Sequence, residues 1–363
     1  MTDGREKLSE REARFTGTMP VRAAHDIDAA ALERFMVAHV AGFRGPLTLA
    51  QFKGGQSNPT YCVSAPSGKY VVRRKPPGKL LPSAHAVDRE YRIIRALQGT
   101  GVPVPKAYAL CIDERVIGTP FYVMEFVEGR VFWDLSLPRV SAAERGAIYD
   151  AMNAGIAALH RVDYIKAGLS DYGKPGDYVA RQIARWTKQY RASATETIPA
   201  MEELIAWLPA HLPADDATTL VHGDYRMDNV IFHASEPKLL AILDWEISTL
   251  GHPFADFAYH CLAYRLPPET GRGLRGIDLE PLGIPSEAAY LGRYCERTGR
   301  TAPPAADWEF YIAYNVFRLA AILQGIMGRV KDGTAASDYA REMGAMAGTF
   351  AQIAWDYAKA IGR

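Results

Sequence analysis

The chain has 363 residues and a formal net charge of +1, from 42 Lys and Arg against 41 Asp and Glu. This length allows two lobes or domains with a large apolar core. Proteins dedicated to nucleic-acid binding usually carry a clear basic excess, so the charge balance argues against a nucleic acid as partner.

Four cysteines lack the C-x-x-C spacing of a zinc or redox site: Cys62, Cys111, Cys261 and Cys295. We therefore expect free, mostly buried thiols in a reducing compartment. The polar N-terminal sequence MTDGREKLSEREARFTG has no apolar signal segment, and no apolar run is expected to reach membrane-spanning length. These features predict a cytoplasmic protein without a membrane partner, and they leave the oligomeric state open.

The first third of the chain predicts a small antiparallel sheet. Residues 1–24 are polar and expected to be flexible, and an apolar stripe over 27–41 predicts a helix. Five short runs bounded by turn-forming residues predict strands: 47–53, 60–64, 69–73, 106–112 and 120–126. A helix over about 84–98 falls between the third and fourth strands, which gives the order β-β-β-α-β-β.

After Gly129 the pattern becomes mainly helical. Ser141 and Glu144 form a capping box that predicts a helix ending at His160. Further apolar stripes predict helices over 177–194, 253–264, 286–299, 304–330 and 335–361. Short strands are expected between about 218 and 245. We therefore predict an α+β, bilobal fold with a flexible N-terminus at 1–24, an N-lobe over 25–127 and a C-lobe over 128–363.

The most informative motif is residues 222–229 (HGDYRMDN), followed by 243–246 (LDWE). Phosphoryl transfer needs one carboxylate to orient and deprotonate the attacking hydroxyl, and carboxylate or amide oxygens to hold Mg²⁺ against the nucleotide phosphates. Asp224 suits the first role, and Asn229 and Asp244 suit the second. Ordinary loop capping by Asp and Asn is the plain alternative.

This motif resembles the aminoglycoside-phosphotransferase and choline-kinase-like branch of the protein-kinase-like superfamily, and the resemblance covers nearly the whole chain. The chain is similar in detail to the kinase-type domain fused to acyl-CoA dehydrogenases, through VVRRKPPGKLLPSAHAVDREYRII, FYVMEFVEGRVFWD and LVHGDYRMDNVIFH. The resemblance implies a protein-kinase-like fold, in which a β-sheet lobe covers the nucleotide and a helical lobe carries the catalytic loop, metal site and acceptor pocket. It also implies ATP and Mg²⁺ as cofactors.

The resemblance assigns further residues to nucleotide binding. They are Gly54, Gly55 and Ser57 in a hairpin over the phosphates, Arg73 in place of the usual strand lysine, its partner Glu90, and Glu125 and Val127 in the adenine-binding segment. Arginine at 73 departs from the best-known pattern but keeps the positive charge. A plain hairpin turn and a pair of solvated surface charges remain the alternatives for Gly54-Gly55 and for Arg73 with Glu90.

The roles of several residues around the catalytic loop rest on the same resemblance. Asp256 is expected to brace this loop, and His222 to orient the backbone around Asp244. Arg226 is a candidate catalytic residue that contacts the transferred phosphate, although pairing with a carboxylate is equally compatible. His160 is expected to be packed and not catalytic. The aromatic residues Trp245, Tyr311, Tyr314 and Phe317 fit the core or a pocket wall better than a ligand cage.

The expected partner is a small-molecule hydroxyl acceptor. From residue 251 onward acidic and basic residues are balanced at 12 each, which disfavours a polycationic aminoglycoside. The basic stretch 73–79, with Arg89, Arg92 and Arg95, is either a solvated surface or a site for an anionic acceptor. The resemblance favours a hydroxyacyl-CoA or a related hydroxy acid. An aminoglycoside, amino alcohol or sugar, and a nucleotide-binding pseudokinase, remain the alternatives.

Overall fold

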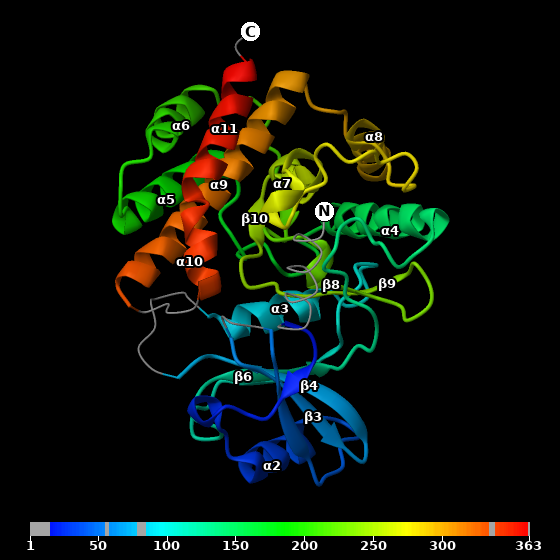
Figure 1. The fold of residues 1–363 in the computed structure, drawn as a ribbon. Coiled ribbons are helices and arrows are strands. Elements are labelled where there is room, and N and C mark those ends of the chain that lie inside the picture. The colour runs from blue at the N-terminus through cyan, green and yellow to red at the C-terminus, as the bar shows by residue number, and fades with distance from the viewer. Residues whose placement is uncertain (1–14, 55–57, 78–84, 334–337, 362–363) are drawn as a thin grey trace.

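A computed structural model describes residues 15–54, 58–77, 85–333 and 338–361. A six-stranded antiparallel sheet at one end adjoins a larger helical portion, and helix α3 (Val87–Leu97) lies where the two meet (Figure 1). The sheet order is β1-β2-β3-β4-β6-β5. Its strands are β1 (Thr18–Met19), β2 (Thr48–Phe52), β3 (Thr60–Ala65), β4 (Gly68–Arg74), β5 (Ala107–Cys111) and β6 (Phe121–Glu125). The predicted α+β, kinase-like architecture is confirmed.

Alternation along the central strands divides the side chains between two faces. Tyr70 and Val72 of β4 pack in the apolar cluster beneath helix α2 (Ala29–His39). Val71 joins the larger cluster on the opposite face, which also contains α3. Because successive strand residues point to opposite faces, Arg73 lies on the same face as Val71, toward the helical portion.

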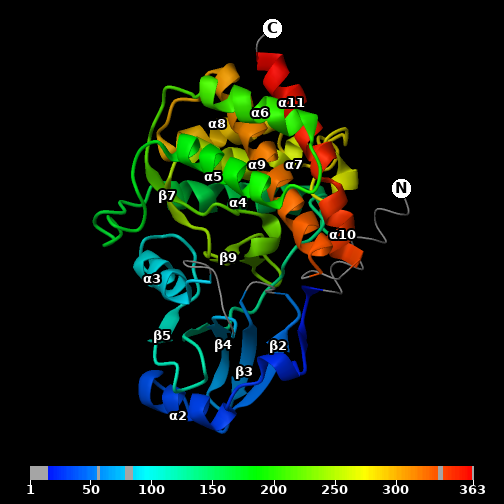
Figure 2. The ribbon, with the colours of Figure 1, turned by 90° about the vertical axis from the view of Figure 1, so that its left-hand side faces the viewer.

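The helical portion is organised around the long helix α9 (Ala305–Lys331), which contacts α5, α6, α7, α10 and α11 (Figure 2). The surrounding helices are α4 (Ala142–His160), α5 (Tyr178–Ser193), α6 (Pro199–Ala210), α7 (Pro253–Arg265), α8 (Glu287–Thr298), α10 (Asp338–Ala345) and α11 (Ala347–Ile361). Seventeen residues of α9 are buried. By length and composition α9 could span a membrane, so the expectation that no run is long enough was too strong. However, 83% of its most apolar window is buried inside the fold, as in a core helix.

Two small antiparallel ribbons carry the loops of the motif. Strand β7 (Thr219–Val221) pairs with β10 (Thr249–Gly251), and β8 (Val230–Phe232) pairs with β9 (Leu239–Ile242). Between β7 and β8 the chain forms the 222–229 loop, which ends in the 3₁₀ turn Met227–Asn229. The ribbons therefore fix both motif segments at strand ends.

Several local predictions differ from the structure. The predicted helix 335–361 is two helices that break at Met346, and α6, β1 and β10 were not predicted. Within the segment expected to be flexible, Thr18–Met19 pairs with β2, while residues 1–14 lie outside the described part. The Ser141 hydroxyl accepts the Glu144 N–H as predicted, but the Glu144 carboxylate pairs with Arg130 and does not complete the box. All four cysteines are free and buried, as expected.

Candidate active site

Asp224 lies just beyond the end of β7, in a loop that its neighbours hold closely. Gly223 has a φ of 82°, a left-handed conformation that glycine adopts at little cost, and its carbonyl accepts a hydrogen bond from Arg318 Nη2 at 2.7 Å. Asn229 Nδ2 donates to both the Asp224 carbonyl and Asp224 Oδ2, each at 2.9 Å. The hydroxyl of Tyr259, on α7, donates to Asp224 Oδ1. Asn229 and Tyr259 thus fix the carboxylate, while Arg318 holds the backbone just before it.

The charge on Asp224 is stabilised by its surroundings. Burial by itself raises the pKa of this carboxyl, but Arg226, the Tyr259 hydroxyl and then Arg272 lower it, and the net pKa lies below the usual value. Burial and the Asp224 charge in turn raise the pKa of Tyr259 to about 12, so its hydroxyl keeps its proton and continues to donate. Asp224 is therefore ionised near neutral pH and can accept a proton.

Arg226 pairs with carboxylates of its own loop. Its Nε lies 3.0 Å from Asp224 Oδ1, and its Nη2 lies 3.4 Å from Asp228 Oδ2. Of the two interpretations left open by the sequence, carboxylate pairing is present in the structure. Contact with the transferred phosphate stays a prediction.

Asp256 braces the catalytic loop from α7. Its Oδ2 accepts the His222 N–H and its Oδ1 accepts the Gly223 N–H, both at 2.8 Å. His160 Nε2 lies 3.1 Å from the same Oδ2, in a fully buried position. His222 Nε2 in turn lies 2.9 Å from the carbonyl of Leu243, the residue before Asp244. The predicted positions of Asp256, His222 and His160 all agree with these contacts.

We expect Asp256→Asn to lower the free energy of unfolding by about 3 kcal/mol, because one amide oxygen cannot replace two carboxylate oxygens facing buried donors. Burial raises the pKa of Asp256, but His160 and the His222 N–H lower it further, so the net pKa is depressed. The contribution of the Asp256 carboxylate to stability is therefore complete above its pKa in the unfolded chain, near 3.8. It is lost as the pH falls toward the lower pKa of the folded protein. The free energy of unfolding, measured with denaturant from pH 3 to 7, should fall less steeply at acid pH in the variant than in wild type. An equally steep fall in the variant would contradict this role of Asp256.

Asn229 and Asp244 are brought together by the β8–β9 ribbon. The Leu243 N–H donates to the Asn229 carbonyl at 2.8 Å, next to Asp244. Asp244 has a φ of 63°, a left-handed conformation that Asp and Asn tolerate better than most residues. Its Oδ1 lies 2.9 Å from Arg73 Nη2, and its side chain is 34% exposed.

The donor set at this position fits Mg²⁺. Asn229 Oδ1 and Asp244 Oδ2 accept no hydrogen bond from any described residue, and both are the hard oxygen ligands that Mg²⁺ prefers. Within the described ranges no group of three or more His, Cys, Asp or Glu could hold a metal alone.

Arg73 is buried and paired, not a solvated surface charge. Its Nε lies 2.8 Å from Glu90 Oε2, on α3. Asn58 Nδ2 and the Tyr122 hydroxyl donate to the two oxygens of Glu90 at 2.9 and 3.0 Å. Burial alone would lower the pKa of Arg73, but Glu90 and Asp244 raise it, so the guanidinium stays charged. The predicted ion pair is present, and it links the sheet and α3 to the metal-site residue.

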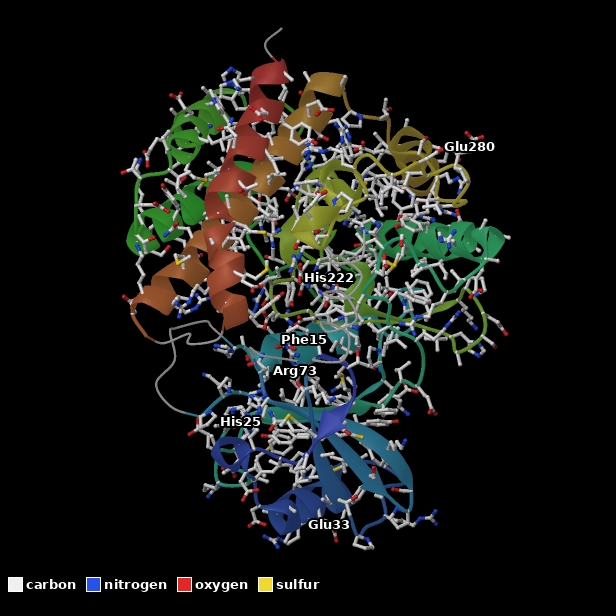
Figure 3. The ribbon with its side chains drawn as sticks, in the orientation of Figure 1. Phe15, His25, Glu33, Arg73, His222 and Glu280 are labelled. Carbon is white, nitrogen blue, oxygen red and sulfur yellow. The ribbon has the colours of Figure 1, made fainter. Side chains whose placement is uncertain are left out.

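A cleft of about 490 Å³ separates the sheet from the helical portion. The predicted site residues that line it are Gly54, Arg73, Glu125, Val127, Asn229 and Asp244. Phe15 and Arg73 lie near this junction and His222 on the helical side (Figure 3). Gly55 and Ser57 lie outside the described residues. Nucleotide binding by these residues stays a prediction.

A second, smaller hollow of about 60 Å³ lies beside the catalytic loop. It shares Trp133 and Asp228 with the large cleft, and Arg226 lines it. Its other walls come from α4, α7, α9 and the chain after α7. Two hollows therefore meet at the catalytic loop, the arrangement that a two-substrate transfer requires.

Three arginines of the basic set, Arg74, Arg89 and Arg92, have partners within the chain. Arg74 is buried, with its Nη1 3.4 Å from the Ile117 carbonyl. Arg89 Nη2 donates to the Tyr172 carbonyl at 2.8 Å, and Arg92 pairs with Asp171. These contacts favour a structural role for the three arginines over anion binding. Residues 78–84 lie outside the described part.

Several residues of the site were not predicted. Tyr259 and Arg318 contact the catalytic loop, Asp228 pairs with Arg226, and Glu246 Oε2 lies 3.5 Å from Arg73 Nη2. Asp228 and Glu246 lie inside the two motif segments, so their position was a usable signal. Tyr259 and Arg318 come from helices, and no sequence pattern marks them. The predicted core aromatics Trp245, Tyr311, Tyr314 and Phe317 are all buried.

The chain is similar in sequence to a known family and to several known proteins. The sequence profile of the phosphotransferase enzyme family (APH) matches residues 48–308. Mouse acyl-CoA dehydrogenase family member 10 is 49% identical over 94% of this chain and 32% of its own length. Rat acyl-CoA dehydrogenase family member 11 is 44% identical over 88% of this chain and 42% of its own length. The chain thus spans less than half the length of these relatives.

Solved structures extend the comparison. A protein from Ralstonia eutropha JMP134, assigned to the aminoglycoside phosphotransferases, is 56% identical, with a TM-score of 0.85 over 92% of this chain and 99% of that one. Choline kinase from Cryptosporidium parvum is 12% identical, with a TM-score of 0.57 over 90% of this chain and 96% of that one. The second likeness concerns the fold alone.

Proposed function

Because this chain belongs to the phosphotransferase enzyme family and is an ATP-dependent phosphotransferase that acts on hydroxyl groups, we propose that its acceptor is a hydroxyacyl-CoA or a related hydroxy acid. The observation that supports the chemistry is the ionised Asp224, whose partners Arg226 and Tyr259 line the small hollow and whose partner Asn229 lines the nucleotide-sized cleft. The names of the curated relatives, acyl-CoA dehydrogenase family members, support an acyl compound as acceptor.

In the proposed reaction, ATP occupies the large cleft and the acceptor hydroxyl reaches Asp224 from the small hollow. Asp224 takes the hydroxyl proton as the oxygen forms a bond to the γ-phosphorus, and the bond to the β-phosphate oxygen breaks to leave ADP. Tyr259 and Asn229 hold the carboxylate in place for this step. Asn229 and Asp244 would hold Mg²⁺, which would neutralise phosphate charge. Arg73 would contact the phosphates.

The charge of the small hollow favours an acyl acceptor over a polycation. Its charged lining residues are Arg226, Arg272 and Asp228, and most of the others are apolar. A polycationic aminoglycoside would call for an acidic surface, and would meet two guanidinium groups here.

The test is transfer from MgATP to a panel of acceptors, with phosphorylated products identified by mass spectrometry and ³¹P NMR. The panel holds 4-hydroxyacyl-CoA, free hydroxy acids, choline, ethanolamine, a hexose and kanamycin. We expect phosphate transfer to the hydroxyacyl compounds. Phosphorylation only of an amino alcohol, sugar or aminoglycoside would refute the proposed acceptor. Binding of MgATP without turnover on a broad panel would favour the pseudokinase alternative.

A further inference from the structure

The small hollow beside the catalytic loop contains an arginine that forms no ion pair or side-chain hydrogen bond with any described residue. Three other arginines of the site are engaged. Arg73 pairs with Glu90, Asp244 and Glu246, and Arg226 pairs with Asp224 and Asp228. Arg318 donates to the Gly223 carbonyl and lies over the Tyr259 ring. The Arg272 side chain forms no ion pair or hydrogen bond with any described residue, and its Nε is buried without a partner.

The chain around Arg272 forms a rigid support. Gly271 ends a 3₁₀ turn with a φ of 68°, and a Cβ on Gly273 would lie 1.8 Å from the Leu266 carbonyl oxygen, so neither position accepts a side chain easily. The next two residues bond back to α7 and its end. Leu274 N donates to the Ala263 carbonyl at 2.7 Å, and Arg275 N donates to the Leu266 carbonyl at 3.0 Å. Arg272 is therefore presented to the hollow from a fixed turn.

The rest of the hollow is suited to a hydrocarbon chain. Its apolar walls include Leu135, Leu262, Ala263, Leu266 and Leu319. His260, which also lines it, has its pKa lowered to about 4 by burial and is therefore neutral. An apolar enclosure with one guanidinium that has no hydrogen-bonded partner is complementary to a chain that bears an acyl oxygen, because leaving the donors of a half-buried guanidinium unsatisfied is costly.

We propose that Arg272 is the specificity-determining residue of the acceptor site, where its guanidinium binds an acyl oxygen of the acceptor while the leucine walls enclose the chain. The ligand would carry an oxygen that accepts a hydrogen bond, next to an apolar chain. A free carboxylate or a thioester carbonyl could each supply this oxygen. This assignment rests on the proposed function, since it places the acceptor hydroxyl at Asp224. Arg272 contributes to the low pKa of Asp224, which is consistent with this closeness.

The experiment compares wild type with Arg272→Met, Arg272→Lys and the control Arg275→Met, an exposed arginine of the same turn. The acceptors are 4-hydroxyoctanoate, its coenzyme A thioester and octane-1,4-diol, which lacks the acyl oxygen. KM and kcat are measured with each acceptor and with MgATP. Acceptor Kd is measured separately by calorimetry in the presence of the non-hydrolysable analogue AMP-PNP and Mg²⁺.

We expect Arg272→Met to raise the KM and Kd of an acyl acceptor by about 10- to 100-fold, the range of one charge-assisted hydrogen bond. The diol and MgATP should be unaffected, Arg272→Lys should recover part of the loss, and Arg275→Met should resemble wild type. If Arg272→Met weakens the free acid more than the thioester, the oxygen that Arg272 binds belongs to the carboxylate. If it weakens the thioester more, the oxygen is the thioester carbonyl. Unchanged acyl-acceptor constants, an equal loss with the diol, or a raised KM for MgATP instead would overturn the proposal.

The two readouts separate this inference from the proposed function. If 4-hydroxyoctanoate binds in an Arg272-dependent manner but receives no phosphate, the proposed function fails and the assignment of Arg272 stands. If phosphate is transferred equally well by Arg272→Met, the assignment fails and the proposed function stands. Absence of any acyl binding to wild type overturns the assignment.

Discussion

Asp224→Asn should lower kcat by about 10³-fold while the Kd of MgATP changes by less than about threefold, because general-base catalysis contributes 10²- to 10⁴-fold. The amide keeps the volume of the side chain but cannot take the hydroxyl proton. The Asp224 partners Arg226 and Tyr259 line the small hollow, whereas the cleft is lined by Asn229 and Asp244. Steady-state turnover with the best acceptor, together with calorimetric titration of the nucleotide, measures both quantities.

The matched control for this variant is Asp228→Asn, the same change four residues later in the same loop. Asp228 also pairs with Arg226, at 3.4 Å, whereas the Tyr259 hydroxyl and Asn229 Nδ2 donate to Asp224. We expect Asp228→Asn to lower kcat by less than about tenfold, since Asp228 has no proposed role in proton transfer and its ion pair with Arg226 is longer than that of Asp224. A loss of less than tenfold in Asp224→Asn would show that another group takes the proton.

Asp244→Asn should abolish most of the dependence of nucleotide binding on Mg²⁺ and lower turnover by about 10³-fold, since a metal between the phosphates supplies several kcal/mol of charge stabilisation. Asparagine is the appropriate substitution because it tolerates the left-handed backbone at this position, with its φ of 63°. Arg73 keeps Glu90 as a partner, so the fold should remain stable. ATP titrations with Mg²⁺ and with EDTA measure the effect.

Glu246→Gln is the control for this experiment. Glu246 is a second carboxylate near Arg73, at 3.5 Å, and its side chain is similarly exposed at 29%. It should retain the Mg²⁺ dependence of wild type. If Asp244→Asn binds MgATP as wild type does, the ion is held elsewhere and the metal role of Asp244 is wrong.

The sequence predicted the parts of the site that are local in the chain. The 222–229 loop and the residues around Asp244 are short motifs in which spacing alone places the groups at adjacent strand ends. Arg73 and Glu90 were predicted through the resemblance, and their contact depends on the alternation of β4 and the position of α3. Local spacing and family likeness thus carried the prediction of the catalytic centre.

The acceptor side could not be predicted in this way. Tyr259, Arg272 and Arg318 lie 35 to 94 residues from Asp224 in the chain, and the packing of helices around α9 brings them to the loop. An apolar stripe indicates that a helix is buried but not which neighbour it meets. A polar residue at the edge of such a stripe, such as Tyr259 or Arg318, therefore cannot be assigned to the site from the sequence alone.

The errors in secondary structure have similar causes. Strands β1 and β10 contain two and three residues, too few to show an alternating pattern. The break between α10 and α11 follows Gly344, where a Cβ would lie 2.9 Å from Met327 on α9, so close helix packing sets this boundary. A continuous apolar stripe conceals such a change in helix direction.

The contacts that hold α3 in place bear on how the activity of the enzyme is controlled. Arg89 and Arg92 tie this helix to the segment around Tyr172, while Glu90 on the same helix holds Arg73. In protein kinases the swing of the corresponding helix switches activity by separating such a pair. Here a swing would have to break an arginine–carbonyl bond, a surface ion pair and a buried ion pair together. We therefore expect that the Arg73–Glu90 pair stays formed and that the reaction rate depends on the concentrations of the two substrates.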